Sequence, residues 1–287
     1  MEINSENEKK YALIGYPLGH SMSKVIHSEL FKITSINANY STIEVSPQKL
    51  QNNKFIQELK NLNGFNVTIP HKINIIPFLD ELSPKAKLFG SVNTVAINKD
   101  KAIGYNTDCD GFLRALESAN IELAGKVLLC GSGGVSRMFA FESILAGADL
   151  TIAVRKADFK AANIIKDEIR EKLSKDCKII LLSEVKGDYD LIINGTPVGM
   201  YPNCDACPLD ENVIKSSKAV FDAIYNPIET MLVRYAKEGG LKYSNGLPML
   251  VWQAAVAEEI WNDGIKFSNE DIEKVINITQ KEILKNA

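Results

Sequence analysis

The sequence has little of what marks an exported or membrane-spanning chain. Its first ten residues, Met1 to Lys10, are polar and carry charges of both signs. They therefore lack the apolar core of a signal peptide and the acid-poor, Arg-rich character of a transit peptide. No apolar run approaches the roughly 18 residues that a membrane-spanning helix needs. We expect a soluble, cytoplasmic protein with no membrane partner.

Cysteine and histidine are also scarce, with five and three residues in a chain of 287. An odd, scattered set of cysteines favours reduced thiols over a disulfide framework. Cys204 and Cys207 form a single CxxC, but neither a second pair nor a nearby histidine completes a zinc motif. His20, His27 and His71 lack the spacing of metal ligands and are expected to make local hydrogen bonds or to lie in helices. No metal site is predicted.

An excess of positive charge is absent too, because the formal net charge is −3. The chain therefore lacks the basic field that attracts nucleic acid or an anionic membrane. Apolar residues make up 45% and charged residues 24% of the sequence, which is the balance of an ordinary globular protein. We expect two medium-sized domains and small-molecule partners.

What is present is an alternation of short apolar strands with helices. In the first third we expect strands at 11–16, 39–45 and 65–69, helices at 23–33 and 46–62, and a hairpin at 92–98 and 101–106. Ser46-Pro47 should open the second helix, because serine caps a helix and proline suits its first turn. This part is predicted to form a small α/β domain.

The rest of the chain alternates more strictly, with helices at 110–120, 135–146 and 157–173 and strands at 127–130, 150–154, 178–182, 191–194, 219–224 and 241–243. Such alternation with short links predicts a parallel, doubly wound sheet. Two further helices, at 247–261 and 268–285, would lie beyond this sheet. The fold class is therefore α/β.

A glycine-rich turn, Gly131-Ser132-Gly133-Gly134-Val135, follows a strand directly and opens a helix. Glycine lets backbone N–H groups approach a pyrophosphate, and the helix N-terminus favours its negative charge. The third glycine falls one place earlier than in the full GxGxxG pattern, and similar turns occur without a ligand. The complete β-α-β frame around the turn favours a dinucleotide site.

The second strand of this frame ends at Val154-Arg155-Lys156. NAD enzymes of this fold place a carboxylate there to bind the ribose 2′-hydroxyl. A guanidinium at that place suits the 2′-phosphate of NADP instead. The alternative is a pair of solvated charges at a strand end. NADP is the predicted cofactor.

Three polar stretches in the first half suggest a substrate site: Ser21 with Ser23, Asn66-Val67-Thr68 through Lys72, and Asn93 with Asn106-Thr107-Asp108. Taken singly, each has an ordinary structural role as a helix cap, a turn or a solvated lysine. Together they supply hydroxyls, amides, one ammonium and one carboxylate at strand ends. That set suits a small, densely hydroxylated substrate such as a polyol or hydroxy acid.

The order of these motifs closely resembles the shikimate dehydrogenase family, with matches spread from Tyr11 to Trp261. Further similar motifs are Asn194-Gly195-Thr196 with Gly199-Met200, Tyr225-Asn226-Pro227, and Gly246 through Gln253. The resemblance implies reversible NADPH-dependent reduction of 3-dehydroshikimate to shikimate, in the chorismate route to aromatic amino acids. It also implies a substrate-binding and catalytic domain at 1–109 with 248–287, a Rossmann-type NADP domain at 110–247, and C-terminal helices that return to the first domain.

The resemblance further implies roles for individual residues. Ser21 and Ser23 would hold the substrate carboxylate, and Lys72 and Asp108 would be the catalytic pair. The other substrate-binding residues would be Asn66, Thr68, Asn93, Tyr225 and Gln253. The cofactor-binding residues would be Gly131, Ser132, Gly133, Gly134, Val135, Arg155, Thr196 and Gly246.

Some positions depart from the family pattern. Lys24 stands where the family usually has proline, and Ser28 replaces a common asparagine. The usual Asn-Arg-Thr cofactor motif is Val154-Arg155-Lys156 here. Arg155 keeps the expected charge, but the loss of its two polar neighbours leaves the strictness of NADP over NAD open.

The chemistry is coherent without the family. Reduction of a ketone requires a hydride on carbon and a proton on the developing alkoxide, so the site needs a positioned acid with a charge partner. Lys72 offers both the proton and the charge, and Asp108 would orient it. The protonation state of Lys72, the extent of domain closure and the choice between monomer and homodimer are not set by the sequence.

Three other hypotheses remain. A quinate/shikimate dehydrogenase would also use NAD and quinate, and Arg155 argues mildly against it. A methylenetetrahydrofolate dehydrogenase has a comparable domain order and a lysine, but it does not explain Asn106-Thr107-Asp108. A non-catalytic NADP-binding sensor would be expected to have lost Lys72 or Asp108, and both are present.

Overall fold

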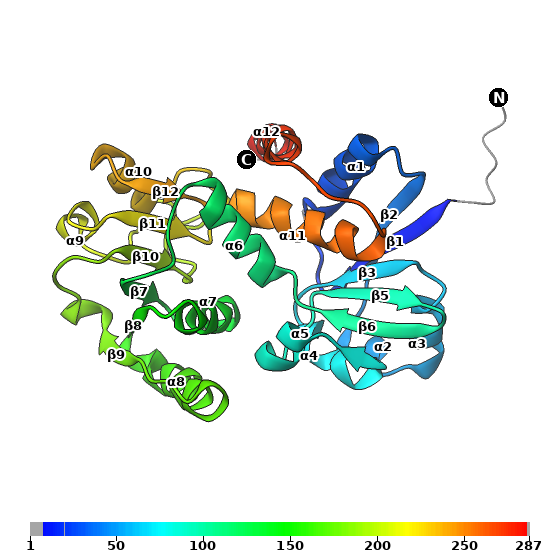
Figure 1. Cartoon of the computed structure of the whole chain (residues 1–287), viewed down its shortest axis with the longest axis horizontal. Coiled ribbons are helices and arrows are strands. Elements are labelled where there is room, and N and C mark those ends of the chain that lie inside the picture. The colour runs from blue at the N-terminus through cyan, green and yellow to red at the C-terminus, as the bar shows by residue number, and fades with distance from the viewer. Residues whose placement is uncertain (1–7, 20, 286–287) are drawn as a thin grey trace. The chain divides into compact units, whose positions relative to one another are not determined.

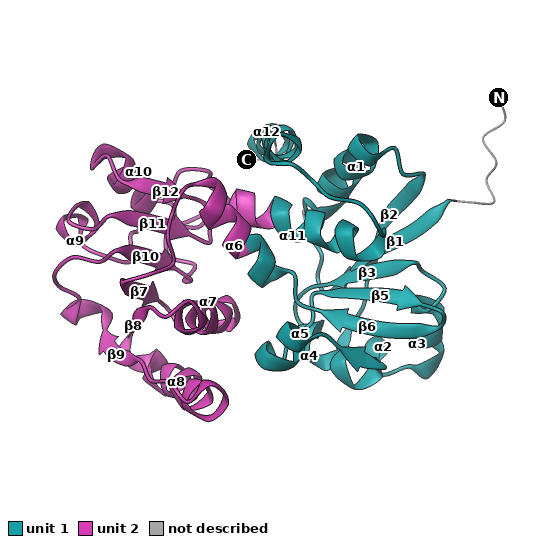
Figure 2. Ribbon diagram, viewed as in Figure 1, with its two compact units in different colours: residues 1–111, 251–287 teal, residues 112–250 magenta. Residues whose placement is uncertain are grey.

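The computed structural model describes residues 8–19 and 21–285, which divide into two compact units (Figure 2). Unit 1 comprises residues 1–111 and 251–287, and unit 2 comprises residues 112–250. The divisions thus fall within three residues of those expected from the sequence. The assignment of substrate to one unit and cofactor to the other stays a prediction.

Unit 1 contains a mixed sheet of six strands in the described residues, in the order β2-β1-β3-β5-β6-β4 (Figure 1). β1 pairs in parallel with β2 and β3, whereas β5 pairs antiparallel with both β3 and β6. The expected hairpin is therefore confirmed. The strands are β1 (Lys9–Gly15), β2 (Ala38–Glu44), β3 (Gly64–Val67), β4 (Glu81–Leu82), β5 (Thr94–Asn98) and β6 (Lys101–Tyr105).

The single helix expected at 46–62 is wrong. Ser46 does cap a helix, because its side chain accepts a hydrogen bond from Lys49 N. That helix ends after one turn, and the side chain of Asn52 then accepts from Lys54 N and caps a second helix. The second N-cap, Asn52, thus divides the expected single helix into two short ones. The unit 1 helices that precede unit 2 in the chain are α1 (Ser23–Thr34), α2 (Pro47–Leu50), α3 (Asn53–Leu59), α4 (His71–Asn74) and α5 (Pro84–Phe89), with a 3-10 turn at Ile76–Phe78.

The C-terminal helices return to unit 1, as the sequence resemblance implied. Helix α11 (Gly246–Trp261) ends there and α12 (Asn269–Lys285) packs against α1. The Trp261 ring stacks on Tyr11 of β1 at 4.5 Å, and its Nε1 donates a hydrogen bond to the Val95 carbonyl at 2.9 Å. Residues far apart in sequence therefore share one core.

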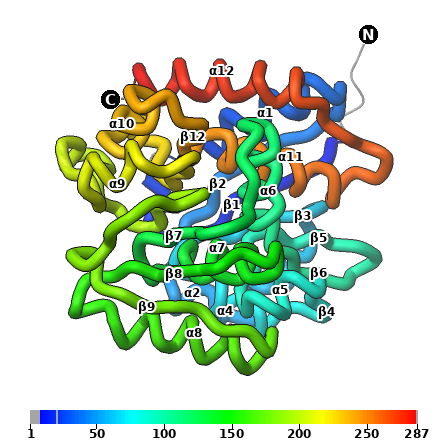
Figure 3. Tube along the Cα trace, turned by 60° about the vertical axis from the view of Figure 1, so that its left-hand side comes forward, coloured from blue at the N-terminus to red at the C-terminus, as the bar shows by residue number. Residues whose placement is uncertain are grey.

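Unit 2 contains an all-parallel sheet of six strands among the described residues, in the order β12-β11-β10-β7-β8-β9. Numbered from β7, this is the 3-2-1-4-5-6 order of a Rossmann fold, so the doubly wound prediction is confirmed. Figure 3 follows the trace from β7 through α7 (Gly134–Leu145), β8 and α8 (Phe159–Leu173) to β9. The strands are β7 (Lys126–Cys130), β8 (Asp149–Val154), β9 (Lys178–Leu181), β10 (Leu191–Asn194), β11 (Ala219–Asp222) and β12 (Lys242–Ser244).

Helices α7 and α8 pack beside β7, β8 and β9, while α9 and α10 pack together beside β11. Phe112, Phe139 and Phe221 are fully buried and meet with ring centroids 4.5 to 5.6 Å apart, joining α6, α7 and the sheet. The helices are α6 (Asp108–Ser118), α7 (Gly134–Leu145), α8 (Phe159–Leu173), α9 (Glu211–Lys215) and α10 (Met231–Glu238), with 3-10 turns at Lys156–Asp158 and Leu182–Glu184.

No helix of the described residues is long and apolar enough to cross a membrane. In the same residues, no three His, Cys, Asp or Glu side chains come together in a way that could hold a metal ion. His20 lies outside the described residues.

Candidate active site and dinucleotide site

Lys72 and Asp108 are in direct contact in unit 1, with the Lys72 Nζ atom 2.7 Å from Asp108 Oδ2. Lys72 lies on the one-turn helix α4, and Asp108 is the first residue of α6. The neighbouring His71 ring is fully buried and its Nε2 lies 2.5 Å from the Val45 carbonyl oxygen, which anchors α4 to the unit. The two charged side chains remain 31% and 21% exposed, so a substrate can reach them.

Asn93 connects this pair to its surroundings. Its Nδ2 donates to Asp108 Oδ1 at 2.9 Å, to Thr107 Oγ1 at 3.0 Å and to Gln253 Oε1 at 3.3 Å. Its Oδ1 accepts from the Thr107 backbone N–H at 2.7 Å. Asp108 is thus held by Asn93 on one oxygen and by Lys72 on the other, so its orientation is fixed before any ligand binds.

Asn66 and the two serines join the same cluster through Tyr40. Asn66 Nδ2 donates to Thr94 Oγ1 at 3.0 Å, and its Oδ1 accepts from the Tyr40 hydroxyl at 2.6 Å. The Tyr40 phenol also makes a hydrogen bond with the Ser23 side chain. Ser23 Oγ lies 3.1 Å from Ser21 Oγ. Thr68 directly follows β3, and its methyl group lies against Gly15 at the end of β1.

No role at this site was predicted for Tyr40, His27 or Glu258. His27 was expected to make local hydrogen bonds or to lie in a helix, and it lies in α1. The His27 ring stacks on Tyr40 with centroids 4.1 Å apart, and its Nδ1 lies 2.5 Å from Glu258 Oε1. Both members of this pair are buried. Burial raises the pKa of Glu258, and His27 opposes that shift. The buried pair therefore fixes the position of the Tyr40 ring through the stacked His27 ring, out of contact with water.

The predicted phosphate turn of unit 2 links β7 to α7. Gly131 has φ +102°, a left-handed conformation that favours glycine, and a Cβ there would lie 2.8 Å from Thr196 Cγ2. At Gly133 and Gly134, by contrast, an added Cβ would meet no described atom within 4 Å. The backbone of these two glycines is therefore open to a ligand.

Arg155 directly follows β8, as predicted, and its side chain is 74% exposed. Its Nε donates to Asp158 Oδ2 at 2.7 Å. The Asp158 carbonyl in turn accepts from Ser132 Oγ at 3.4 Å, which ties this segment to the phosphate turn. The free cation that the sequence suggested is thus paired with a carboxylate. A 2′-phosphate would have to compete with Asp158 for it.

The remaining predicted cofactor residues also lie at the carboxyl ends of strands in unit 2. Thr196 follows β10, and Gly246 donates its N–H to the Ile224 carbonyl at 2.9 Å just beyond β11. A Cβ at Gly246 would collide with the Ala223 carbonyl, so glycine is required there. Tyr225, predicted to contact substrate, is partly buried in the same loop after β11.

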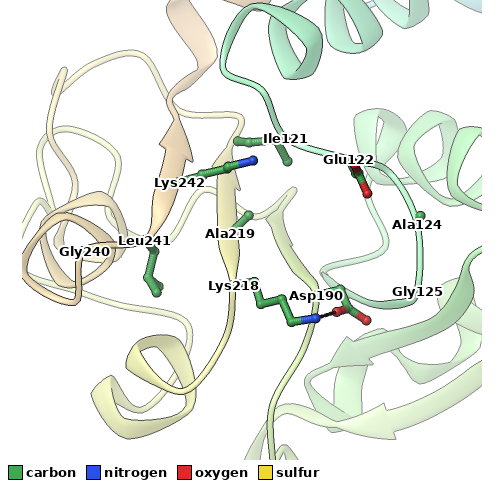
Figure 4. Close-up of a pocket in the computed structure, with 10 residues that line it drawn as sticks. All are labelled: Ile121, Glu122, Ala124, Gly125, Asp190, Lys218, Ala219, Gly240, Leu241 and Lys242. Carbon is green, nitrogen blue, oxygen red and sulfur yellow. Dashed lines mark ion pairs between the residues drawn. The ribbon is translucent and has the colours of Figure 1, made fainter.

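A hollow of about 680 Å³ in unit 2 lies at the opposite end of the strands from the predicted cofactor residues (Figure 4). Gly125 before β7, Lys218 before β11 and Lys242 at the start of β12 line it, so it faces the amino ends of the strands. Lys218 forms an ion pair with Asp190 there, at 2.7 Å. Dinucleotides bind at the carboxyl ends of such sheets, so this hollow is not the cofactor site.

Residues 13–95 match the family model of the shikimate dehydrogenase substrate binding domain. A shikimate dehydrogenase (NADP(+)) from Methanococcus maripaludis is 43% identical over 258 residues, covering 88% of this chain and 91% of that protein. The chain belongs to the shikimate dehydrogenase family.

Solved structures of the family agree with this assignment. Shikimate 5-dehydrogenase from Thermus thermophilus, in complex with NADP(H) and shikimate, is 30% identical with a TM-score of 0.83, over 94% of this chain and 99% of that chain. The enzyme from Listeria monocytogenes, in complex with shikimate and NAD, is 32% identical with a TM-score of 0.83, over 97% and 98%. The shikimate dehydrogenase fold therefore extends over both units.

Proposed function

We propose that this protein is an NADP-dependent oxidoreductase, a shikimate dehydrogenase that reversibly reduces 3-dehydroshikimate to shikimate in chorismate and aromatic amino-acid biosynthesis. Family membership over nine-tenths of the chain supports the reaction. The single structural observation that carries it is the Lys72–Asp108 contact at 2.7 Å, with Asn93 on the second carboxylate oxygen. Unit 1 would bind the substrate and unit 2 the cofactor.

NADPH, when bound, supplies the hydride. The open backbone at Gly133 and Gly134 suits its pyrophosphate, because no protein atom fills the space beside these two residues and glycine adds no side chain to it. Arg155, released from Asp158, would hold the 2′-phosphate with two parallel hydrogen bonds. Thr196 and Gly246 would lie beside the dinucleotide.

The residues of unit 1 handle the proton and the substrate. Lys72 would donate a proton to the developing alkoxide in reduction and take it back in oxidation, while Asp108 keeps the ammonium oriented. Ser21 and Ser23 would hold the substrate carboxylate through their adjacent hydroxyls. Gln253, Asn93 and Thr68 would meet ring hydroxyls. Asn66, whose amide N–H groups already bond to Thr94 and Asn93, would chiefly hold its neighbours in place.

The cytoplasm is the proposed location, since none of the five cysteines forms a disulfide and three of them are buried. The substrate is the expected small-molecule partner, and a monomer or homodimer is the proposed assembly. Size-exclusion chromatography with light scattering will distinguish the two assemblies.

A spectrophotometric assay of shikimate and quinate, each with NADP and with NAD, tests the proposal. We expect the highest kcat/KM with shikimate and NADP. Equal or better activity with quinate and NAD would instead identify a quinate/shikimate dehydrogenase. The NAD complex of the Listeria enzyme makes that comparison necessary. NADPH binding without turnover of either substrate would point to a non-catalytic sensor.

A further inference from the structure

The carboxyl ends of β10 and β11 carry a buried polar network that has no part in the proposed chemistry. Asp222 ends β11 and is fully buried. Its Oδ1 accepts hydrogen bonds from Asn194 Nδ2 at 3.0 Å and from the Ile224 backbone N–H at 3.1 Å, and its Oδ2 accepts from the Thr230 hydroxyl at 2.6 Å. Three donors therefore converge on one carboxylate, which offsets the cost of burying its charge.

Asn194 transmits the orientation of Asp222 to the loop after β10. Because Asn194 Nδ2 faces Asp222, its Oδ1 faces the other way and accepts from Thr196 N at 3.0 Å and Thr196 Oγ1 at 2.7 Å. Thr196 Oγ1 accepts in turn from Val198 N at 3.2 Å. A flipped Asn194 amide would set its oxygen against the carboxylate of Asp222. The carboxylate thus selects one amide orientation and one loop conformation.

The Thr196 loop lies directly against the phosphate turn. Gly195 N donates to the Cys130 carbonyl at 2.9 Å, and Ser136 Oγ donates to the Gly195 carbonyl at 3.2 Å. A Cβ at Gly131 would lie 2.8 Å from Thr196 Cγ2, so the two loops leave no space between them there. β7 and β10 are neighbours where the strand order of the sheet reverses, which is where dinucleotides bind in this fold.

We propose that Asp222 is a positioning residue of the NADP site: through Asn194, its carboxylate holds the Thr196 loop against the phosphate turn. Asp222 does not touch the cofactor in this arrangement. The inference rests on the proposed function, because it requires that the turn binds NADP.

The charge of Asp222 depends on pH near neutrality. Burial raises the pKa of Asp222 to about 6, although the bonds from Thr230, Ile224 and Asn194 oppose the shift. The titratable groups that face Asp222 are the thiols of Cys130 and Cys207, whose pKa values are raised chiefly by burial and also by the charge of Asp222. Among the ion pairs of the described residues, none includes Asp222. The carboxylate is therefore charged above about pH 6 and neutral below it.

The effect of pH on affinity runs opposite to its effect on stability. A carboxyl whose folded pKa lies above its unfolded value stabilises the fold most below the unfolded pKa, and this contribution is lost as the pH rises through the folded pKa. Acid thus protects the fold through Asp222, while it weakens the charge-assisted bond to Asn194. A loss of cofactor affinity in acid, with the fold intact and beyond the loss caused by protonation of the 2′-phosphate, would come from the loop.

Two substitutions and a matched control test the proposal by NADPH fluorescence titration. Asp222→Ala removes all three acceptor contacts, and we expect it to weaken NADPH binding about ten- to a hundredfold while leaving shikimate affinity within about twofold. Asp222→Asn can still accept from Asn194 and donate to Thr230, and should retain binding within about threefold of the unmodified protein. Asp210→Asn makes the same chemical change at the exposed cap of α9 and should change nothing.

A pH titration provides a readout that does not depend on the folding of a variant. From about pH 7.5 to about pH 5, the unmodified protein should lose about threefold more NADPH affinity than Asp222→Asn, because the 2′-phosphate titrates equally in both. Circular dichroism at each pH checks the fold. Equal pH profiles, or an Asp222→Ala protein that is folded and binds NADPH normally, would overturn the inference. Failure of the unmodified protein to bind NADPH would instead overturn the proposed function.

Discussion

The two predicted sites are built in different ways. In unit 1, side chains hold one another. A continuous series of side-chain hydrogen bonds runs from Lys72 through Asp108, Asn93 and Thr94 to Asn66 and Tyr40. In unit 2, the phosphate turn is bare backbone, and its predicted charge contact, Arg155, is mostly exposed. The first site is ordered before a ligand arrives, whereas the second offers space and donors that a ligand must engage.

This difference determines which substitutions each site tolerates. A cluster of mutually bonded side chains is sensitive to the loss of a single polar atom, because its partner is left unpaired. A turn that binds through its backbone does not depend on the polar groups of its side chains. Its affinity for a ligand is lowered instead by any added side-chain volume, since the added atoms occupy the space of the ligand. The following substitutions test that contrast, beginning with the largest expected effect.

Lys72→Met should lower kcat about 10²- to 10⁴-fold, because it removes the proton donor but keeps much of the apolar stem. The dissociation constant for shikimate, measured by calorimetry, should change much less. The double variant with Asp108→Asn should be little worse than the worse single variant, since the two residues act as a unit. Near-normal kcat under conditions where chemistry limits turnover would leave Lys72 as a binding residue only.

Arg155→Ala should raise the KM for NADP roughly ten- to a hundredfold with little change for NAD, because only NADP carries the 2′-phosphate. The ion pair with Asp158 makes the companion variant Asp158→Asn informative. It removes the charge that holds Arg155 and leaves at most a neutral hydrogen bond, so it should improve the KM for NADP. Equal losses with both cofactors in Arg155→Ala would show that the arginine serves the loop and not the phosphate.

Substitutions at Gly133 and Gly131 distinguish the effect of added volume in the site from the effect of backbone strain. Gly133→Ala places a methyl group in open space and should keep the melting temperature, yet weaken NADP and NAD equally, by about tenfold. Gly131→Ala should lower the free energy of unfolding by about 1–3 kcal/mol, because it forces a side chain into a left-handed conformation against Thr196. Differential scanning calorimetry and NADPH titration of both proteins provide the comparison. The opposite pattern would contradict the assignment of the turn.

Tyr40→Phe is expected to have the smallest effect. It removes the hydroxyl that joins Asn66 to Ser23 but keeps the ring stacked on His27. One neutral hydrogen bond is worth about 0.5–1.5 kcal/mol, so the KM for shikimate should rise roughly two- to tenfold with kcat nearly unchanged. Ser23→Ala provides the direct comparison. If both variants bind shikimate normally, the serines act as helix caps and not as carboxylate ligands.

Local signals in the sequence predicted much of this structure. The helix expected at 268–285 is confirmed as α12, and Ser268 caps it: its hydroxyl donates to the Asp271 carboxylate and accepts the Asp271 N–H. The glycine turn and the doubly wound sheet follow from strand-to-helix spacing alone. The Lys72–Asp108 contact and the place of Gln253 beside Asn93 agree with the family resemblance, while their chemical roles stay predictions.

Other features were beyond the reach of local patterns. Helix α4 is a single turn and β4 has only two residues, which is too short for a periodicity to show. The contact of His27 with Glu258 joins residues 231 positions apart, and no spacing rule connects them. The partner of Arg155, Asp158, is only three positions away. A cation at a strand end is nevertheless expected to face solvent or a phosphate, so the sequence did not predict this ion pair.

Unit 1 is discontinuous in the chain, and this bears on the order in which the protein is made and folds. Tyr11 donates a hydrogen bond to Asn262, 251 positions later, so a ribosome must translate all of unit 2 before the core of unit 1 can close. Unit 2 is continuous in the chain and can fold earlier. Once folded, it is a compact insert between the two parts of unit 1, which reduces the entropy lost when those parts come together. Until then, the faces of β1 and α1 that receive Trp261 and Glu258 remain uncovered and open to chaperones.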